Sequence, residues 1–305
     1  MLGEHQWVIA CYPERAQEEV WGDDPAANAS SSLVPRAHAR RVDGGYRLSG
    51  SWPFSSGCGH AKWAIIGAFC GAEQNATHQR FCLVPLAQAQ VVDDWQVLGL
   101  EGTGSRSLRL DDVFVPDHRT VSFDDLNAGT PPGAAAHPQW PMVRAPRMMF
   151  APFSQPPVAI SLARKLLDMV TDLARTRVSR AVTRVADSEI THLKLAESAT
   201  EIETATRLLQ WRRERAVQLL YSGVPIPPME GLATRRDIVY TQKLVRSAAD
   251  RLGTLAGAGW VYDANPLQPV LRDIQTCLTH GVAVFETAMV PYGKAMLSGD
   301  ARMPT

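Results

Sequence analysis

A short, nearly uncharged stretch carries hydroxyl groups whose types and spacing could do chemistry. Residues 50–69 read GSWPFSSGCGHAKWAIIGAF and contain two tryptophans and four glycines between what look like two β-strands. Ordinary loops are polar and solvated. An apolar loop that still offers hydroxyl and backbone donors suits a flat, partly polar ligand. We therefore expect this loop to bind one.

A second candidate for chemistry is His280. It follows Asp273 by seven residues, which is two turns along a predicted helix and nearly the same face. An imidazole titrates near neutrality and can move a proton. A lone histidine in an apolar helix is more often a core residue bonded to a backbone carbonyl, so both interpretations stay open from the residues alone. No role is assigned to the other seven histidines: His5, His38, His60, His78, His118, His137 and His192.

The bulk composition excludes some functions. The 305 residues contain 31 Lys and Arg against 31 Asp and Glu, with a pI of about 7.1. No net field draws such a chain to nucleic acid or to an anionic membrane. No apolar run approaches the roughly 20 residues that cross a bilayer. The five cysteines form no C-x-x-C pair, which gives zinc or dithiol chemistry little support. We expect free, buried thiols in a soluble, cytoplasmic protein.

The patterning changes in the middle of the chain. Before residue 120, Asp43-Gly44-Gly45 predicts a hairpin turn, and the runs WAIIGAF, QRFCLVPL, VVDDWQVLGL and SRSLRLDDVFVP predict a mostly antiparallel β-domain. Residues 125–157 break this pattern with a Pro-, Gly- and Ala-rich stretch, which we expect to be a connector packed on the surface.

Helical periodicity begins at Pro157. Four long helices are predicted, the second capped by Asp187-Ser188, the third over 232–255 and the fourth over 266–296. Arginines on these helices, Arg212 among them, are expected on solvated faces.

Three blocks occur in the order and at the separations of one known fold: SGSWPFSSGCGHAKWAIIGA, LGLEGTGSRSLRLDDVFVP and NPLQPVLRDIQTCLTH. With them the sequence resembles the acyl-CoA dehydrogenase fold. It resembles most closely the branch of reduced-flavin-dependent monooxygenases, the oxygenase components of two-component phenol, phenylacetate and secosteroid hydroxylases. The resemblance extends from about residue 7 to the end of the chain.

The resemblance implies an α+β fold in which a central antiparallel β-domain precedes a C-terminal four-helix bundle. The expected boundaries are a remnant of an N-terminal helical domain at 1–28, the β-domain at 29–125, a linker at 126–156 and the bundle at 157–305. Most of the helical domain that precedes the β-domain in the family is not in this sequence. The family also implies a homotetramer.

The implied activity is hydroxylation of a small aromatic substrate, phenolic or polyketide-like, through a C4a-hydroperoxyflavin. Reduced FMN or FAD would come from a separate flavin reductase, and O2 would be the co-substrate. The chain lacks the G-x-G-x-x-G fingerprint of nicotinamide-binding domains, which fits a reductase on another chain. Neither a nucleic acid nor a membrane is an expected partner.

The resemblance also implies site residues. Phe54 matches an aromatic residue packed on the isoalloxazine, Ser56 matches a hydroxyl that meets flavin N5, and Arg177 matches an arginine that reaches the flavin diphosphate of a neighbouring subunit. His280 matches a histidine near the substrate hydroxyl. The implied catalytic residues are His280 and Ser56, and the implied cofactor-binding residues are Ser32, Trp52, Phe54, Ser55, Ser56, Gly57 and Arg177.

Two other functions remain open from the sequence. In many acyl-CoA dehydrogenases a glutamate abstracts the substrate α-proton, and Ala264 stands at the matching position here. Alanine cannot act as a base, which counts against an acyl-CoA dehydrogenase-like reaction or another flavin-dependent tailoring reaction. The short N-terminal region keeps a third alternative, a non-catalytic structural subunit of the same fold.

Overall fold

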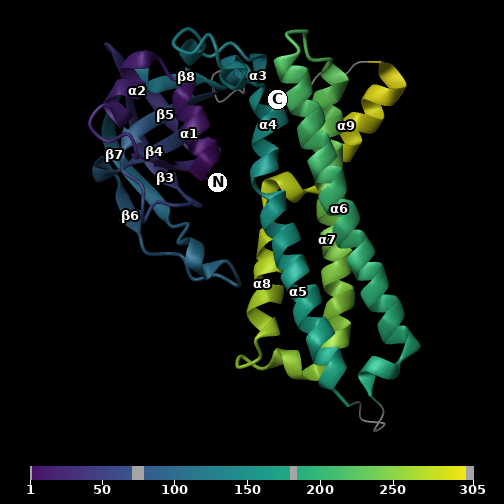
Figure 1. The fold of residues 1–305 in the computed structure, drawn as a ribbon. Helices are drawn as coiled ribbons and strands as arrows, with labels where there is room; N and C mark the ends of the chain where they lie inside the picture. The colour runs from purple at the N-terminus through teal and green to yellow at the C-terminus, as the bar shows by residue number, and fades with distance from the viewer. Residues whose placement is uncertain (1, 71–78, 179–183, 300–305) are drawn as a thin grey trace. The chain divides into compact units, whose positions relative to one another are not determined.

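The chain is divided into two compact units. The computed structural model describes residues 2–70, 79–178 and 184–299. The N-terminal unit is rich in strands and ends at residue 151, whereas the C-terminal unit is helical and also takes in residues 97–100 (Figure 1). Each unit encloses apolar core residues of its own.

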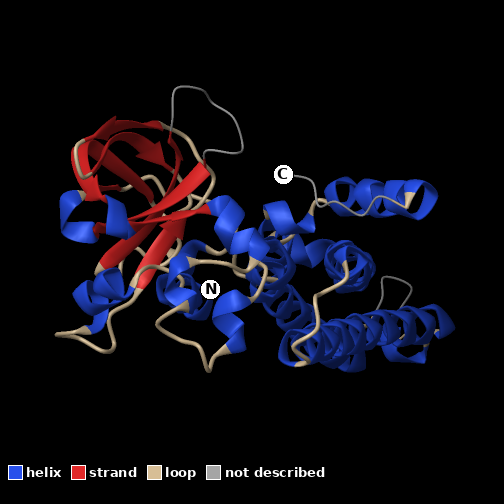
Figure 2. Cartoon of the chain, turned by 90° about the horizontal axis from the view of Figure 1, so that it is seen from above, coloured by secondary structure: helices blue, strands red, loops and turns tan. Residues whose placement is uncertain are grey.

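The described part of the N-terminal unit contains a sheet of eight strands in the order β6-β7-β3-β2-β4-β5-β8, with β1 paired to β4. The strands, red in Figure 2, curl around one another. Most pairs are antiparallel, as predicted, but β1 and β2 both run parallel to β4, so the sheet is mixed. The strands are β1 (Ala29–Ser32), β2 (His38–Val42), β3 (Gly45–Trp52), β4 (Trp63–Cys70), β5 (Gln79–Pro85), β6 (Gln90–Val92), β7 (Ser107–Pro116) and β8 (Thr120–Ser122).

The sheet is buried on both faces, which explains the unbroken apolar run in β4. Trp63 and Ile65 belong to the core on one face, while Ala64 and Ile66 belong to the core on the other. Successive side chains of a strand point to opposite faces. A strand covered on both sides therefore needs apolar residues at every position.

The structure confirms the expected hairpin turn but not the full length of the last-but-one expected strand. The hairpin turn between β2 and β3 is confirmed, and Gly44 adopts a φ of 72° there, which only glycine takes at no steric cost. The run VVDDWQVLGL, by contrast, contributes only the short β6, and the residues after Val92 leave the sheet.

The connector between the sheet and the helices is not a surface segment. Val143, Met149 and Phe150 are all buried, and Trp7 donates from its indole nitrogen to the carbonyl of Met142 at 2.8 Å. The expectation of a surface connector is therefore wrong, since Ala134 and Val143 belong to the core on one face of the sheet. The helices of this unit are α1 (Leu2–Ala10), α2 (Glu14–Trp21), α3 (Phe123–Ala128) and α4 (Arg147–Phe150).

The C-terminal unit packs its helices around a core of small and branched apolar residues. Its helices are α5 (Pro156–Thr176), α6 (Glu189–Tyr221), α7 (Pro228–Ala256), α8 (Leu267–Cys277) and α9 (Phe285–Ser298). The expected fourth helix over 266–296 is wrong, since the chain leaves the helix after Cys277 and starts α9 only at Phe285 (Figure 1). Ser188 precedes α6 as predicted, but its side chain forms no capping hydrogen bond.

A buried ion-pair network joins α6 to α7. Arg212 is only 3% exposed, so it does not lie on a solvated face as expected. Its Nε donates to Asp237 at 2.6 Å and its Nη1 donates to Glu230 at 2.8 Å. Arg236 donates to the other oxygen of Asp237 at 2.7 Å. Because both arginines share Asp237, that carboxylate holds the network together.

Asp237→Ala should therefore lower the free energy of unfolding by about 3–5 kcal/mol, the usual cost of leaving a buried charge without its partner. Urea unfolding would measure it. The control is Arg213→Ala, which removes an exposed arginine from the same helix and should change the free energy by no more than about 0.5 kcal/mol. Similar small losses in the two variants would contradict a structural role for the network.

All five cysteines are buried and free, as expected. None of the described helices combines the length and the apolar character that a membrane crossing requires.

Candidate active site

The loop that joins β3 to β4 is held from two sides. On one side the Ser32 hydroxyl donates to the carbonyl of Pro53 at 2.6 Å, and the Ser55 hydroxyl donates to the side-chain hydroxyl of Ser30 at 3.0 Å. On the other side the backbone N–H of Ser55 donates to the carbonyl of Arg106 at 3.0 Å. The shape of the loop is thus set by β1 and by the residue before β7.

Phe54 projects from this loop in an unusual backbone conformation. Its φ is 61° and its side chain is 63% exposed. A bulky residue at positive φ costs on the order of 1–3 kcal/mol, and such strain is concentrated at functional sites. Gly57, with a φ of 86°, adopts its own left-handed conformation without that cost. The loop therefore presents an exposed aromatic ring on a strained but well-anchored backbone.

The Ser56 hydroxyl belongs to a chain of three hydroxyl groups. It lies 3.0 Å from the Ser105 hydroxyl, which lies 3.0 Å from that of Thr103. A hydroxyl can donate once and accept twice. Ser56 can therefore accept from Ser105 and direct its own proton towards a ligand. The role of Ser56 as a donor to flavin, expected from the resemblance, stays a prediction.

Two other predicted residues lie inside the protein. Trp52 and Ser55 have no exposed surface. The Trp52 indole donates to the carbonyl of Gly67 at 2.8 Å, and the Ser55 hydroxyl is engaged with Ser30. These contacts are those of residues that support the loop.

His5 was given no role in the sequence, yet the structure places it in a buried hydrogen-bond chain. It lies on α1 and is 3% exposed. Its Nδ1 lies 2.6 Å from the carbonyl of Ala29, and its Nε2 lies 2.8 Å from the Ser31 hydroxyl. A carbonyl can only accept, so Nδ1 carries the proton and Nε2 accepts from Ser31. Burial lowers the pKa of His5, which favours the neutral form that can take up a proton.

A sequence signal for the burial of His5 did exist. Val8, Ile9 and Tyr12 follow it at i+3, i+4 and i+7 and are all buried. The pattern could have placed His5 on the inner face of a helix, although not beside Ser31.

Ser31 and Ser56 connect the two hydrogen-bond chains. They form an isolated antiparallel bridge between β1 and the loop. Side chains of directly opposed residues share a face and have Cβ atoms about 5 Å apart. The hydroxyl bonded to His5 and the hydroxyl bonded to Ser105 therefore belong to neighbouring positions of one surface.

Arg147 is a charged group whose bonding is incomplete. Its side chain is 14% exposed, Nη2 lies 3.7 Å from Glu4, and the guanidinium lies over the Phe81 ring. Its buried Nε has no hydrogen-bond partner among the described residues. Burial lowers the pKa of Arg147 from its usual value. Buried donors without a partner are exceptional in folded proteins.

The remaining predicted residues belong to the helical unit. Arg177 donates to the carbonyl of Leu255 at 2.8 Å and packs so closely on Gly257 that a Cβ there would lie 2.0 Å from its guanidinium. His280 is exposed, and it does not share a helical face with Asp273 because α8 has already ended. Its Nδ1 accepts from the backbone N–H of Val282 at 3.3 Å. Asp273 instead accepts from the backbone N–H of Leu100 at 2.6 Å.

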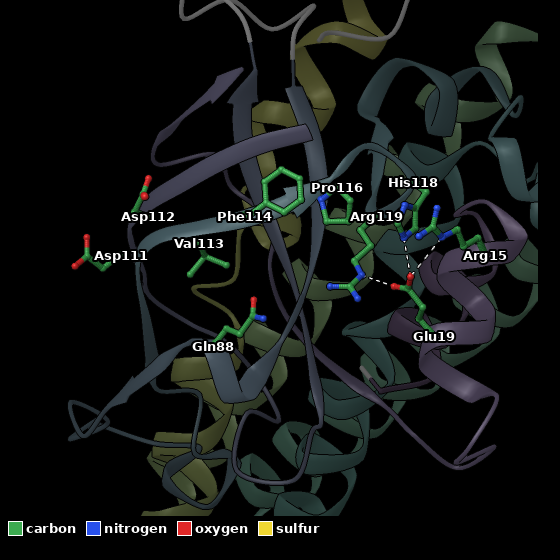
Figure 3. A pocket seen from close by; sticks show the side chains of 10 residues that line it. All are labelled: Arg15, Glu19, Gln88, Asp111, Asp112, Val113, Phe114, Pro116, His118 and Arg119. Atoms are coloured by element: carbon green, nitrogen blue, oxygen red, sulfur yellow. Dashed lines mark hydrogen bonds and ion pairs between the residues drawn. The ribbon is translucent and has the colours of Figure 1, made fainter. Parts of the chain in front are cut away.

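A hollow of about 550 Å³ lies on the N-terminal unit, between α2, β7 and the turn at 117–119 (Figure 3). Arg119 and His118 both donate to Glu19 there. Although burial raises the pKa of Glu19, these two hydrogen bonds outweigh it and hold the pKa below its usual value. The hollow contains none of the predicted site residues, and its main charges neutralise one another.

Comparison with known proteins supports the flavin interpretation. Residues 154–285 match the family model described as acyl-CoA dehydrogenase, C-terminal domain. The chain is 33% identical to the oxygenase subunit HsaA of a flavin-dependent monooxygenase from Mycobacterium tuberculosis, over 96% of this chain and 75% of the relative. It is 31% identical to the oxygenase component of an FADH2-dependent resorcinol hydroxylase from a Rhizobium species, over 97% of this chain and 75% of the relative.

The chain belongs to the flavin-dependent monooxygenases. Solved structures agree with this assignment. The 3-HSA hydroxylase of Rhodococcus sp. RHA1 superposes with a TM-score of 0.91 at 31% identity, over 100% of this chain and 77% of that one. XiaF from a Streptomyces species, solved with FADH2 and glycerol, gives a TM-score of 0.85 at 28% identity, over 98% and 76% of the two chains. The monooxygenase therefore has an acyl-CoA dehydrogenase-like fold and uses reduced flavin.

Phe54, which is exposed, and Ser56, which is partly buried, fit that cofactor. Phe54 offers an aromatic face and Ser56 an adjustable hydroxyl donor, and neither carries charge. A flavin ring is flat and apolar on its faces and has hydrogen-bonding atoms along its edge. Phe54 and Ser56 are the residues that would hold it.

Proposed function

We propose that this monooxygenase hydroxylates a phenolic ring, using flavin reduced by a separate reductase. The relatives support this by name, since they include oxygenase components and a resorcinol hydroxylase. When bound, reduced flavin would supply the electrons and the activated oxygen. The observation that supports the proposal is the bridge between Ser31 and Ser56, because the hydrogen-bond chain of Ser31 and His5 would then lie beside the hydroxyl proposed to face flavin.

Each group of this site has a distinct task in the proposal. Ser31 would accept the phenol proton while passing its own proton to Nε2 of His5. Loss of that proton makes the aromatic ring of the substrate more electron-rich. Ser56 would donate to the flavin edge, and Phe54 would cover the flavin face. Trp52 and Ser55 would act by keeping the loop in shape.

The test is an assay with reduced FAD, oxygen and a matched pair of substrates, resorcinol and its dimethyl ether. Hydroxylated resorcinol should form, whereas the ether, which has no acidic proton, should give mainly hydrogen peroxide. Equal hydroxylation of both compounds would contradict the proton-accepting role. Failure to hydroxylate any phenol would contradict the proposed function.

In this proposal His280 acts as a hydrogen-bond donor and not as the base. Because its Nδ1 accepts from Val282, its Nε2 carries the proton and is a donor. His280→Ala should therefore slow hydroxylation only about tenfold, the effect of one hydrogen bond. His280→Asn keeps a side-chain donor and should recover most of the rate. If both variants lose more than tenfold in hydroxylation rate, and the acid limb of their pH–rate profile also disappears, His280 is the base instead.

The architecture of the functional protein is also part of the proposal. We expect α5 to α8 to form the four-helix bundle, with a helical segment at 1–28, the β-domain at 29–125, a linker at 126–156 and the bundle domain at 157–305. A homotetramer is supported by exposed apolar side chains on α9, including Met296 and Leu297. Arg177 would reach the flavin phosphates of a neighbouring subunit. Five buried, free thiols fit a reducing compartment, the cytoplasm.

A further inference from the structure

Phe54 needs a contact beyond its own loop to hold one orientation. The backbone of the loop is fixed, since Ser55 donates to Arg106 and the N–H of Ser56 donates back to the carbonyl of Phe54 at 2.9 Å. The Phe54 ring itself is 63% exposed. Backbone hydrogen bonds do not fix the side-chain rotamer, and an exposed ring changes rotamer in picoseconds to nanoseconds.

Trp95 supplies such a contact. The rings of Phe54 and Trp95 meet edge to face, with centroids 6.0 Å apart and planes at 89° (a T-shaped pair). This arrangement is favoured because the positive edge of one ring meets the negative face of the other. Trp95 comes from the irregular segment after β6, far from Phe54 in sequence.

The two rings are anchored to the same short piece of backbone. Next to Trp95, Asp93 accepts from Nε of Arg106 at 2.9 Å, and Asp94 accepts from the backbone N–H of Ser107 at 2.9 Å. The carbonyl of Arg106 holds the Phe54 loop through Ser55. Residues 106 and 107 therefore set the distance between the segment of Trp95 and the loop of Phe54.

We propose that Trp95 is a positioning residue, which holds the Phe54 ring in the orientation that stacks on reduced flavin. This inference rests on the proposed contact between Phe54 and flavin. In it Trp95 lowers the cost of ordering Phe54 when flavin binds, because the ring is already held in place.

A double-mutant cycle on the binding of dithionite-reduced FAD, measured without oxygen, tests the proposal. Trp95→Ala should weaken binding about twofold to tenfold, as expected for one aromatic pair. Trp95→Phe keeps an aromatic edge and should bind like the wild type. In a Phe54→Ala background, Trp95→Ala should cause no further loss.

Additive losses from the two substitutions would overturn the proposal, as would unchanged binding by Trp95→Ala. Trp95→Leu serves as a second variant if the alanine variant does not fold. Trp140→Ala is the matched control, because Trp140 is a tryptophan of the same unit that stacks on His137, with ring centroids 5.0 Å apart, instead of on Phe54. It should leave binding within about twofold of the wild type.

A flavin-free measurement separates this inference from the proposed function. The near-ultraviolet circular dichroism of the Phe54–Trp95 pair should change on Phe54→Ala, and the change should vanish in a Trp95→Phe background. If the wild type binds no reduced FAD, both the proposed function and this inference fail. If it binds and the Trp95 variants bind equally well, only the positioning inference fails.

Discussion

Ser56→Ala should lower the rate of substrate hydroxylation by about 10²–10³-fold, the usual cost of removing one oriented donor from a reaction centre. The structure gives the reason. Ser56 can accept from Ser105 and so aim its own proton at the flavin edge. Alanine removes that donor and leaves the aromatic face of Phe54 in place. Flavin should still bind, while the electrons that it carries should go mainly to hydrogen peroxide.

The measurement is the ratio of hydroxylated resorcinol to hydrogen peroxide per reduced FAD. Ser56→Thr keeps the hydroxyl and should restore most of that ratio. Ser105→Ala, which breaks the chain one position further back, should have an intermediate effect. Ser51→Ala removes an exposed hydroxyl of β3 and should leave the ratio unchanged. An unaltered ratio in Ser56→Ala would rule out the donor role.

The sequence predicted much of this loop because its signals are local. Apolar residues at every position of β4 show that both faces are covered, and Gly44 marks the hairpin turn before β3. The resemblance identified Phe54 and Ser56. Phe54 is exposed and Ser56 is partly buried, and their role stays a prediction until flavin binding is measured.

What the sequence did not predict depends on contacts between distant segments. His5 is buried because α1 packs on β1, and its partners lie 24 and 26 residues away. Trp95 looked like part of a strand, and only its contact with Phe54 distinguishes it. The break between α8 and α9 was missed because apolar residues resume at 282–284 after Thr279, His280 and Gly281, and no proline lies in the stretch.

Replacement of His5 by glutamine should lower the rate of resorcinol hydroxylation by about 10²–10⁴-fold. Glutamine can still donate to the carbonyl of Ala29, so α1 should stay in place. It cannot take up a proton from Ser31. Thermal unfolding near pH 8 should show a melting temperature close to that of the wild type, which would separate lost chemistry from lost structure.

The pH profile distinguishes His5 from any other base. Burial lowers the pKa of His5 below its usual value near 6.5, so the neutral form persists into mildly acidic solution. The acid limb of wild-type hydroxylation should therefore lie below pH 6.5. Stability should follow the same group: its contribution is present above the unfolded pKa and is lost as the pH falls through the folded pKa. Both dependences should disappear in His5→Gln, and an acid limb retained by that variant would assign the base to another residue.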